Sequence, residues 1–207
     1  AVLLLVYLLL CGESCQEDGS STLARERELK AEKEFIRDEF ESDWLDEASR
    51  HAHEQAAIQK LGDLADYMNV FADPSLDPAF REKAGEMILK LFVSDKATLI
   101  NVPGDAGRKR EITVRKMLEK GRKDKLLFSE VRFESVLVVQ ALHKSGDGSY
   151  RGYLACTGHT TIYTGEDTLQ AAQPVLIEVH VNQAEKVFGP DTLNVWEVLL
   201  GDLRARK

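Results

Sequence analysis

The sequence predicts an α+β domain, in which N-terminal helices pack on a curved, mainly antiparallel sheet of four to five strands with a cone-like shape. Apolar residues recur every three or four positions in the first half of the chain, whereas from Leu126 onward they alternate with polar ones. Strong turn signals also separate the long alternating runs. Helices followed by hairpins are typical of an α+β domain whose helices cover one face of an antiparallel sheet.

Length and composition limit the class of protein. The chain has 207 residues, enough for one domain and a tail, and its 43% hydrophobic and 30% charged residues are typical of a chain that buries a core. Its 27 basic and 35 acidic residues give a net charge of −8, which disfavours nucleic acid as a partner because such binding depends on Lys and Arg at phosphates. Three cysteines exclude a small disulfide-stapled scaffold.

Residues 1–10 contain no charged or strongly polar side chain, and they predict export of the protein. A helix of this length spans about 15 Å, half of a hydrocarbon core of roughly 30 Å, so the run is too short to cross a bilayer. It has the length of the apolar region of a secretory signal. A buried strand or helix of the globule is the alternative interpretation of the same residues.

A cysteine and an acidic stretch follow this apolar run. The small residue and cysteine of Ser14-Cys15 resemble the end of a bacterial lipoprotein signal, and the acidic stretch Cys15-Gln16-Glu17-Asp18 is similar to the start of the tether of envelope lipoproteins of the Bacteroides group. The resemblance implies that Cys15 is acylated and that the protein is exported and anchored in the membrane of the cell envelope, facing the periplasm or the surface. Gly12 and Glu13 depart from the small and aliphatic residues usual there, so ordinary signal cleavage with a free Cys15 stays open.

The expected domain organisation follows from these features. Residues 1–15 are the signal remnant ending near the lipidation cysteine, residues 16–43 are a charged tether and the start of a long helix, and residues 44–207 are a single α+β domain. The stretch 23–50 is rich in charge and contains neither glycine nor proline. Within it Ile36, Phe40 and Trp44 lie four residues apart, which places them on one helical face.

The helical pattern continues to Phe71 and is broken by the proline-containing stretch 73–78. Asp77 before Pro78 predicts the start of the next helix, because the aspartate side chain caps the helix and proline suits its first position. We expect this helix to run to about Phe92 and to bury five apolar side chains, namely Phe80, Ala84, Met87, Ile88 and Leu91. A short strand at Thr98–Val102 and a short helix at Ile112–Lys120 follow.

The second half of the chain predicts four long segments of sheet. A first strand ends at the turn Lys144–Ser149, and Tyr150–Tyr163 returns as its hairpin partner. We expect a connecting loop at Thr164–Gln173, a third strand at Val175–Val187 and a last strand at Leu193–Leu203. The side chains of the third strand expected to face inward are Val175, Ile177, Val179 and Val181.

Long hairpins after N-terminal helices, finished by a strand such as Trp196–Asp202, resemble the nuclear-transport-factor-like superfamily. In that superfamily a curved sheet forms a cone, as in ketosteroid isomerase and in many small envelope lipoproteins. The resemblance covers Trp44 to Leu203 and rests on the order of the elements. A cystatin-like arrangement, with one helix across the sheet, stays open as an alternative.

Sequence motifs for metals, cofactors and common catalytic centres are absent from the chain. The sequence contains no CxxC, HExxH, P-loop, GxGxxG or Gly-x-Ser-x-Gly pattern, so we expect no cofactor and no metal. His51 and His53 are two residues apart on a predicted helix, which puts them on different faces. We expect His51 to form a surface ion pair with Glu47 or Glu54. Cys156 lies in an alternating apolar stretch, and we expect it to be a small buried side chain.

One strand face collects polar side chains. Tyr153, Thr157 and His159 share a face of the predicted second strand, where they either bind a small polar ligand or form the solvated face of the sheet. The second interpretation is the more ordinary one for an antiparallel sheet. His180 lies beside Glu178 on the face opposite the inward valines, so we expect it to point to solvent.

A basic segment stands out in this acidic chain. Nine basic residues between Arg108 and Lys125, minus three acidic ones, give a local charge of +6. The candidates for binding anionic lipid headgroups or an acidic partner are Lys109, Arg110, Arg122 and Lys123. The alternative is that this segment faces the acidic first helix of the same chain.

These observations favour a lipid-anchored cell-envelope protein whose domain is a non-catalytic binding or assembly module. The expected partners are the membrane, through the anchor, and an envelope protein. The alternative is a small-molecule isomerase or hydrolase that uses the interior of the cone. An inner face filled by Val, Leu and Phe would favour the binding module, whereas an enclosed pocket with an Asp or Glu opposite a Tyr or His would favour the enzyme.

Overall fold

The computed structural model describes residues 25, 27–28, 30–31, 42, 44–100, 111–123, 130–164, 167–189 and 191–206. The chain divides into two compact units, Ala1–Ser42 and Asp43–Lys207. The described residues between 25 and 31 in the first unit are helical and exposed. The predicted signal remnant, the lipid attachment residue Cys15 and the predicted helical residues Ile36 and Phe40 lie outside the described residues.

The second unit contains three helices among its described residues, α3 (Glu47–Ala72), α4 (Pro78–Leu91) and α5 (Val114–Gly121). Each begins at a polar capping residue. Asp46 accepts a hydrogen bond from the Ser49 N–H at 2.7 Å, Asp77 from Ala79 at 2.7 Å, and Thr113 from Lys116 at 3.3 Å. The helix start predicted at Asp77 and Pro78 is therefore confirmed.

The first predicted helix does not continue unbroken through residue 50. Residues 44–46 are not helical, because Asp46 has extended backbone angles and caps a new helix that begins at Glu47. Trp44 is 60% exposed instead of lying on a packed helical face. The short helix predicted from Ile112 begins at Val114, since the three residues before it form a strand.

Two side chains predicted on the buried face of α4 differ from expectation. Phe80 is 68% exposed, because it lies in the first turn next to the exposed corner formed by residues 74–79. Met87 is only half-buried. Ala84, Ile88 and Leu91 are buried as predicted.

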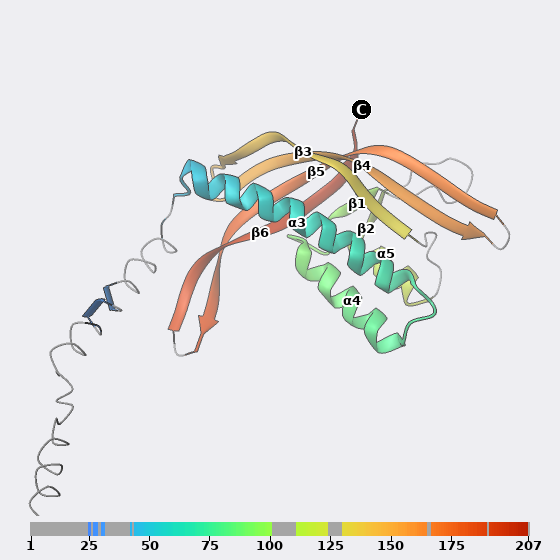
Figure 1. Cartoon of the computed structure of the whole chain (residues 1–207), viewed down its shortest axis with the longest axis horizontal. Helices are drawn as coiled ribbons and strands as arrows, with labels where there is room; N and C mark the ends of the chain where they lie inside the picture. The colour runs from blue at the N-terminus through green and yellow to red at the C-terminus, as the bar shows by residue number, and fades with distance from the viewer. Residues whose placement is uncertain are drawn as a thin grey trace, which may run out of the picture. The chain divides into compact units, whose positions relative to one another are not determined.

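The strands are β1 (Thr98–Ile100), β2 (Glu111–Thr113), β3 (Glu130–Lys144), β4 (Tyr150–Thr164), β5 (Asp167–Phe188) and β6 (Asp191–Ala205). β1 and β2 pair antiparallel, and the other four form an antiparallel sheet in the order β3-β4-β5-β6. This arrangement confirms the α+β class with a mainly antiparallel sheet. The β4–β5 and β5–β6 hairpins extend at opposite ends of the sheet (Figure 1).

The loop predicted at Thr164–Gln173 is wrong. Residues 167–173 form the first part of β5 and pair with β4 from Thr164↔Asp167 to Gly158↔Gln173. The composition of this stretch is polar and small, which favours a loop when it is considered alone. Cross-strand pairing decides strand formation more than local propensity does, so the hairpin partner overrides that composition.

Irregular pairing bends two of the strand pairs. The β3–β4 register shifts between Glu134 and Leu137 and twice more before His143, and the β5–β6 register shifts between Ile177 and Val179. Ser135 lies in the first of these shifts and has a φ of 55°, a left-handed conformation that is uncommon outside glycine. Bulges of this kind increase the local twist and bend of the strand.

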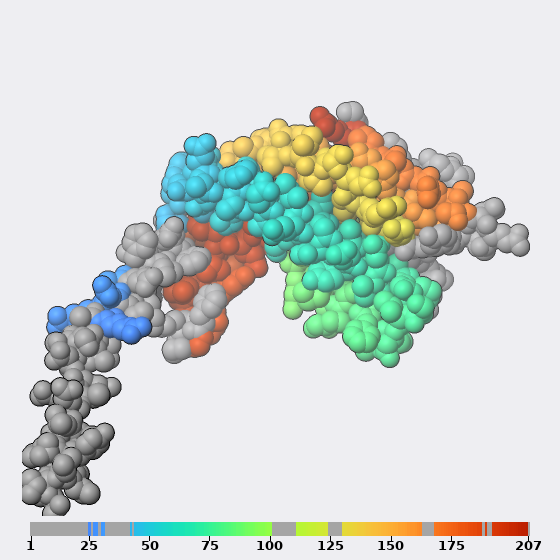
Figure 2. All heavy atoms as spheres, in the orientation of Figure 1, coloured from blue at the N-terminus to red at the C-terminus, as the bar shows by residue number. Residues whose placement is uncertain are grey.

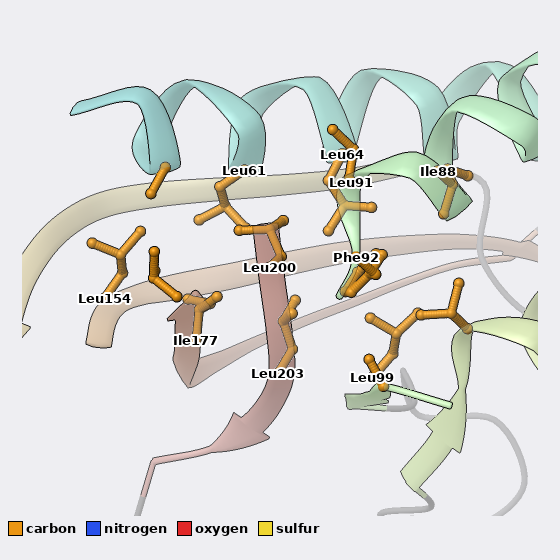
Figure 3. Close-up of a cluster of buried hydrophobic side chains, with 14 of the residues drawn as sticks. Leu61, Leu64, Ile88, Leu91, Phe92, Leu99, Leu154, Ile177, Leu200 and Leu203 are labelled. Carbon is orange, nitrogen blue, oxygen red and sulfur yellow. The ribbon is translucent and has the colours of Figure 1, made fainter. Parts of the chain in front are cut away.

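One hydrophobic cluster joins the helices to the sheet. Figure 3 shows Leu61 and Leu64 of α3 and Leu91 of α4 beside Leu154 and Leu200 of the sheet, and all five are buried. The prediction for the inward face of β5 is confirmed, since its four residues are all buried: Val175, Ile177, Val179 and Val181. The helices α3 and α4 lie on the same side of the sheet (Figure 1).

The segment between α4 and β1 is joined to the last strand. Val93 N–H donates to the Leu200 carbonyl at 2.9 Å, and Thr98 N–H donates to Asp202 Oδ1 at 2.8 Å. Burial opposes the charge of Asp202, but the hydrogen bonds from Thr98 and Arg204 outweigh it and hold the pKa of this carboxyl below its usual range. The helical half and the sheet are thus joined by backbone contacts as well as by the core.

Candidate functional site

The three residues predicted as a ligand site lie on the outer face of β4, away from the hydrophobic cluster. Tyr153, Thr157 and His159 are half-buried, whereas Leu154 and Cys156 between them are buried on the inner face. The strand rises about 3.3 Å per residue, so the backbone positions of Tyr153 and His159 are roughly 20 Å apart. The structure therefore places the three on one face but does not gather them into a single site.

His159 has a partner on the neighbouring strand. Its Nε2 lies 3.3 Å from Oε2 of Glu134 on β3. The imidazole is 35% exposed and the carboxylate 55% exposed, so water screens their interaction. This pair fits the solvated sheet face better than a desolvated acid–base pair.

A second histidine–carboxylate pair is more buried than sequence analysis expected. His180 Nε2 lies 3.3 Å from Glu178 Oε1, and the two side chains are only 12% and 20% exposed. The prediction that His180 points to solvent is therefore wrong. In the sheet register Arg151 lies opposite His180 and Tyr153 lies opposite Glu178.

The space for His180 depends on a glycine of the adjacent strand. A Cβ added at Gly201 would lie 2.8 Å from His180 Nε2, closer than real Cβ atoms come to other atoms, and 3.0 Å from Glu178 Cβ, which is tighter than most such contacts. The imidazole thus occupies the place that a side chain on β6 would fill. The sequence alone places Glu178 and His180 on one face of β5, because they are two residues apart. That Gly201 lies beside them follows only from the pairing of β5 with β6.

The inner face of the sheet is packed with apolar side chains. Among the described residues, a space of about 40 Å³ is lined mainly by apolar residues of α3, β1, β3, β5 and β6, and β4 contributes three residues to it, namely Gly158, His159 and Thr160. Small-molecule sites usually have about 300–1,000 Å³, so this space is too small for an ordinary substrate. The carboxylates Glu178 and Glu197 are also paired elsewhere, with His180 and with Lys186 at 3.0 Å.

A larger groove lies at the end of β4. It has a volume of about 640 Å³ and is lined by Lys144, residues 147–149 of the β3–β4 turn, Asn182 and Gln183 of β5, and Trp196 of β6. It forms because β4 starts at Tyr150, opposite Val181, while β5 and β6 continue paired to Phe188↔Asp191. Sequence analysis did not predict this groove, whose residues come from three separate stretches of the chain.

The turn beside the groove is held by one carboxylate. Asp147 accepts hydrogen bonds from the N–H of Ser149 at 3.1 Å, from its hydroxyl at 2.5 Å and from Arg151 at 3.0 Å. The Ser149 hydrogen bonds, followed by Arg151, hold the pKa of Asp147 below its usual range. The turn thus presents a fixed carboxylate and hydroxyl at the rim of the groove.

The basic segment is only partly described, since Lys109 and Arg110 lie outside the described residues. Arg122 forms a two-pronged pair with Glu82 of α4, with nitrogen–oxygen distances of 3.1 and 2.6 Å. Lys123 is exposed at the end of α5. In the described part of this segment, Arg122 therefore pairs with α4, an arrangement that neither sequence interpretation anticipated.

The remaining sequence expectations concern single residues. Cys156 is buried as predicted, and burial raises the pKa of its thiol to about 11. His51 Nδ1 lies 3.7 Å from Glu54 Oε2 at the surface of α3, which confirms the predicted pair. Across the described residues no group of three or more potential ligands is arranged to hold a metal ion. No helix in the described part of the chain is both long and apolar enough to cross a membrane.

Comparison with known proteins finds no matching protein-family model, no matching curated protein and no matching solved structure. The functional assignment therefore depends on the residues of this chain and on the geometry described above.

Proposed function

We propose that this chain is a lipid-anchored cell-envelope protein whose second unit is a non-catalytic binding or assembly module. The observation that carries the proposal is the packed inner face of the sheet. Leu61, Leu154, Ile177 and Leu200 are each at most 1% exposed there. A module of this kind uses its interior for stability and binds at its surface, where the groove at the end of β4 supplies a hollow of about 640 Å³.

The isomerase or hydrolase alternative finds less support. Such an enzyme needs a carboxylate base that faces a hydrogen-bond donor within an apolar pocket. The half-buried His180–Glu178 pair is the least exposed histidine–carboxylate pair among the described residues, but it lies on the outer face and does not line the small apolar space. His159 does line that space, but its partner Glu134 is 55% exposed. Both observations favour binding over catalysis.

The proposal includes a nuclear-transport-factor-like cone for the second unit. Its support is that two helices, α3 and α4, contribute side chains to the same core as the sheet, and that bulges bend two strand pairs. A cystatin-like arrangement with one helix across the sheet would use only one helix in this way.

The anchor is tested by labelling the full chain with an alkyne-bearing fatty acid during expression in a bacterial host. We expect the label on the wild-type chain and its loss in Cys15→Ala, while Cys11→Ala keeps the label. Membrane partition should follow the label, since several acyl chains are needed for stable anchoring. Labelling that survives Cys15→Ala, or a wild-type chain without label, contradicts the anchor.

The binding function is tested by photo-cross-linking in the intact envelope. A benzoylphenylalanine placed at Gln183, in the groove, should give a discrete adduct, because a bound molecule lies against it. The control position is Gln170, an exposed glutamine in the other end of the same strand. Equal adducts from both positions, or none from Gln183, contradict binding at the groove.

A further inference from the structure

Both tryptophans of the chain pack against Tyr150, and one of them, Trp196, lines the groove. Tyr150 packs edge-on against Trp44, with ring centroids 6.4 Å apart, and against Trp196, with centroids 5.4 Å apart. Tyr150 is 1% exposed, and its hydroxyl accepts a hydrogen bond from the Leu45 N–H at 2.9 Å. The buried tyrosine therefore fixes the position of the indole of Trp196, which forms one wall of the groove.

Two residues with side-chain amides, Asn182 and Gln183, line the same groove. Asn182 and Gln183 follow directly after the last residue of β5 that pairs with β4, so the groove runs along the open edge of β5. Each amide offers two N–H donors and a carbonyl acceptor within one planar group. Adjacent residues of a strand point to opposite faces, which spreads these hydrogen-bonding groups around the edge.

The charges at the groove are few and are balanced. Its titratable residues are Lys144 and Asp147, and Asp147 already holds Ser149 and Arg151. Lys144 Nζ lies 5.5 Å from the ring centre of Trp44, in the geometry of a cation–π contact. An anionic ligand would need converging cations and an apolar ligand an apolar lining, and the groove has neither among its described residues.

We propose that this groove binds a neutral oligosaccharide. A sugar ring has a face of C–H groups that packs on an aromatic ring and a rim of hydroxyls that both donate and accept hydrogen bonds. Trp196 supplies the first surface, and the amides of Asn182 and Gln183 with the Ser149 hydroxyl supply partners for the second. This inference rests on the proposed binding function and adds the chemical class of the ligand.

The position of the tryptophans allows a direct measurement. The full chain is titrated with chitotriose, maltotriose and cellotriose while its tryptophan emission is recorded, because Trp196 lines the groove and the other tryptophan, Trp44, contacts the same tyrosine as Trp196 does. We expect a saturable change with at least one of the three sugars and confirmation by calorimetry. Inorganic phosphate and a Gly/Ser hexapeptide, used at the same concentrations, should give no saturable change.

Substitutions in and outside the groove test whether the sugar binds there. The Asn182→Ala, Gln183→Ala double variant should weaken binding at least tenfold, whereas Gln170→Ala and Asn194→Ala, which change exposed amides outside the groove, should leave the affinity unchanged. Trp196→Phe should weaken binding and remove the emission change. If Trp196→Phe fails to fold because of its contact with Tyr150, the double variant still tests the site, because Gln183 is exposed and Asn182 is only half-buried.

The outcomes separate this inference from the proposed function. No saturable binding of any of the three sugars overturns the inference, and so does binding that the double variant leaves intact. Tighter binding of phosphate or of the hexapeptide overturns the ligand class. A discrete adduct at Gln183 together with absence of sugar binding refutes the oligosaccharide alone, whereas absence of both refutes the binding function.

Discussion

The side-chain amide of Asn69 on α3 forms two hydrogen bonds with the backbone of Val131 on β3. Val131 N–H donates to Asn69 Oδ1 at 2.7 Å, and Asn69 Nδ2 donates to the Val131 carbonyl at 3.1 Å. β3 is an outer strand of the four-stranded sheet, so Asn69 takes the place of a neighbouring strand at this residue. Figure 2 shows α3 lying against the surface of β3.

A similar contact occurs near the other end of β3. Leu142 N–H donates to Glu54 Oε1 at 2.8 Å, and Arg50 Nη1 donates to the Leu142 carbonyl at 3.4 Å. Side chains of one helix therefore satisfy backbone groups at two separate points of the sheet edge. This arrangement limits the pairing of β3 with another chain, because an open strand edge is a template for association.

Asn69→Leu should lower the free energy of unfolding by about 2 kcal/mol, because it leaves a backbone donor and acceptor without their partners. The change is measured by urea denaturation. The control is Gln59→Leu, at an exposed position of the same helix, which we expect to change the free energy of unfolding by less than about 0.5 kcal/mol. Equal effects of the two substitutions would show that the Val131 contact contributes nothing measurable.

Gly201→Ala should destabilise the fold by about 1–3 kcal/mol, because its Cβ would lie 2.8 Å from His180 Nε2 and would displace the His180–Glu178 pair. The matched substitution is Gly62→Ala, on the exposed side of α3 with no atom within 4 Å of the new Cβ. We expect Gly62→Ala to stabilise the fold by about 0.5–1 kcal/mol through helix propensity. Thermal unfolding of both variants checks the opposite signs, and a neutral Gly201→Ala would contradict the tight packing of His180.

Because its thiol is buried, Cys156 should cause the free energy of unfolding to decrease at alkaline pH. Burial raises the pKa of its thiol from 9.0 to about 11 in the folded chain, so the unfolded chain loses this proton first. The contribution of the protonated Cys156 thiol to the free energy of unfolding is fully present below pH 9 and is lost as the pH rises through 11. The measurement is the free energy of unfolding from pH 8 to 11 for the wild type minus that for Cys156→Ala, which cancels the other groups that titrate in this range. A difference that stays constant with pH would contradict the burial of the thiol.

The basic segment should bind anionic lipid surfaces, and Lys123→Glu should weaken that binding. Each basic residue near such a surface contributes about 1 kcal/mol, so reversal of one charge should reduce partition to phosphatidylglycerol vesicles by about fivefold or more. Vesicle sedimentation at low and high salt measures the effect. Lys83→Glu serves as the control, since Lys83 lies on α4 and pairs with Glu86 at 2.7 Å. Equal losses in the two variants would assign the effect to net charge instead of to this segment.

Local sequence patterns, namely helix caps and the periodicity of apolar residues, determined most of the helices and strands. The capping pair Asp77 and Pro78 marks the start of α4, because both effects act within one turn of the helix. The alternation along Val175, Ile177, Val179 and Val181 marks the buried face of β5, since a strand has a period of two residues. The burial of Cys156 follows from the same period.

Contacts between distant segments decided the rest. Residues 167–173 became a strand only because β4 lies beside them, and His180 is largely shielded from solvent because Gly201 of the next strand leaves room for its ring. The groove joins residues 144–149, 182–183 and 196, which no local pattern connects. Periodicity records which face a side chain occupies, but the partner across that face depends on strand pairing and register, and these are determined by the packing of the whole unit.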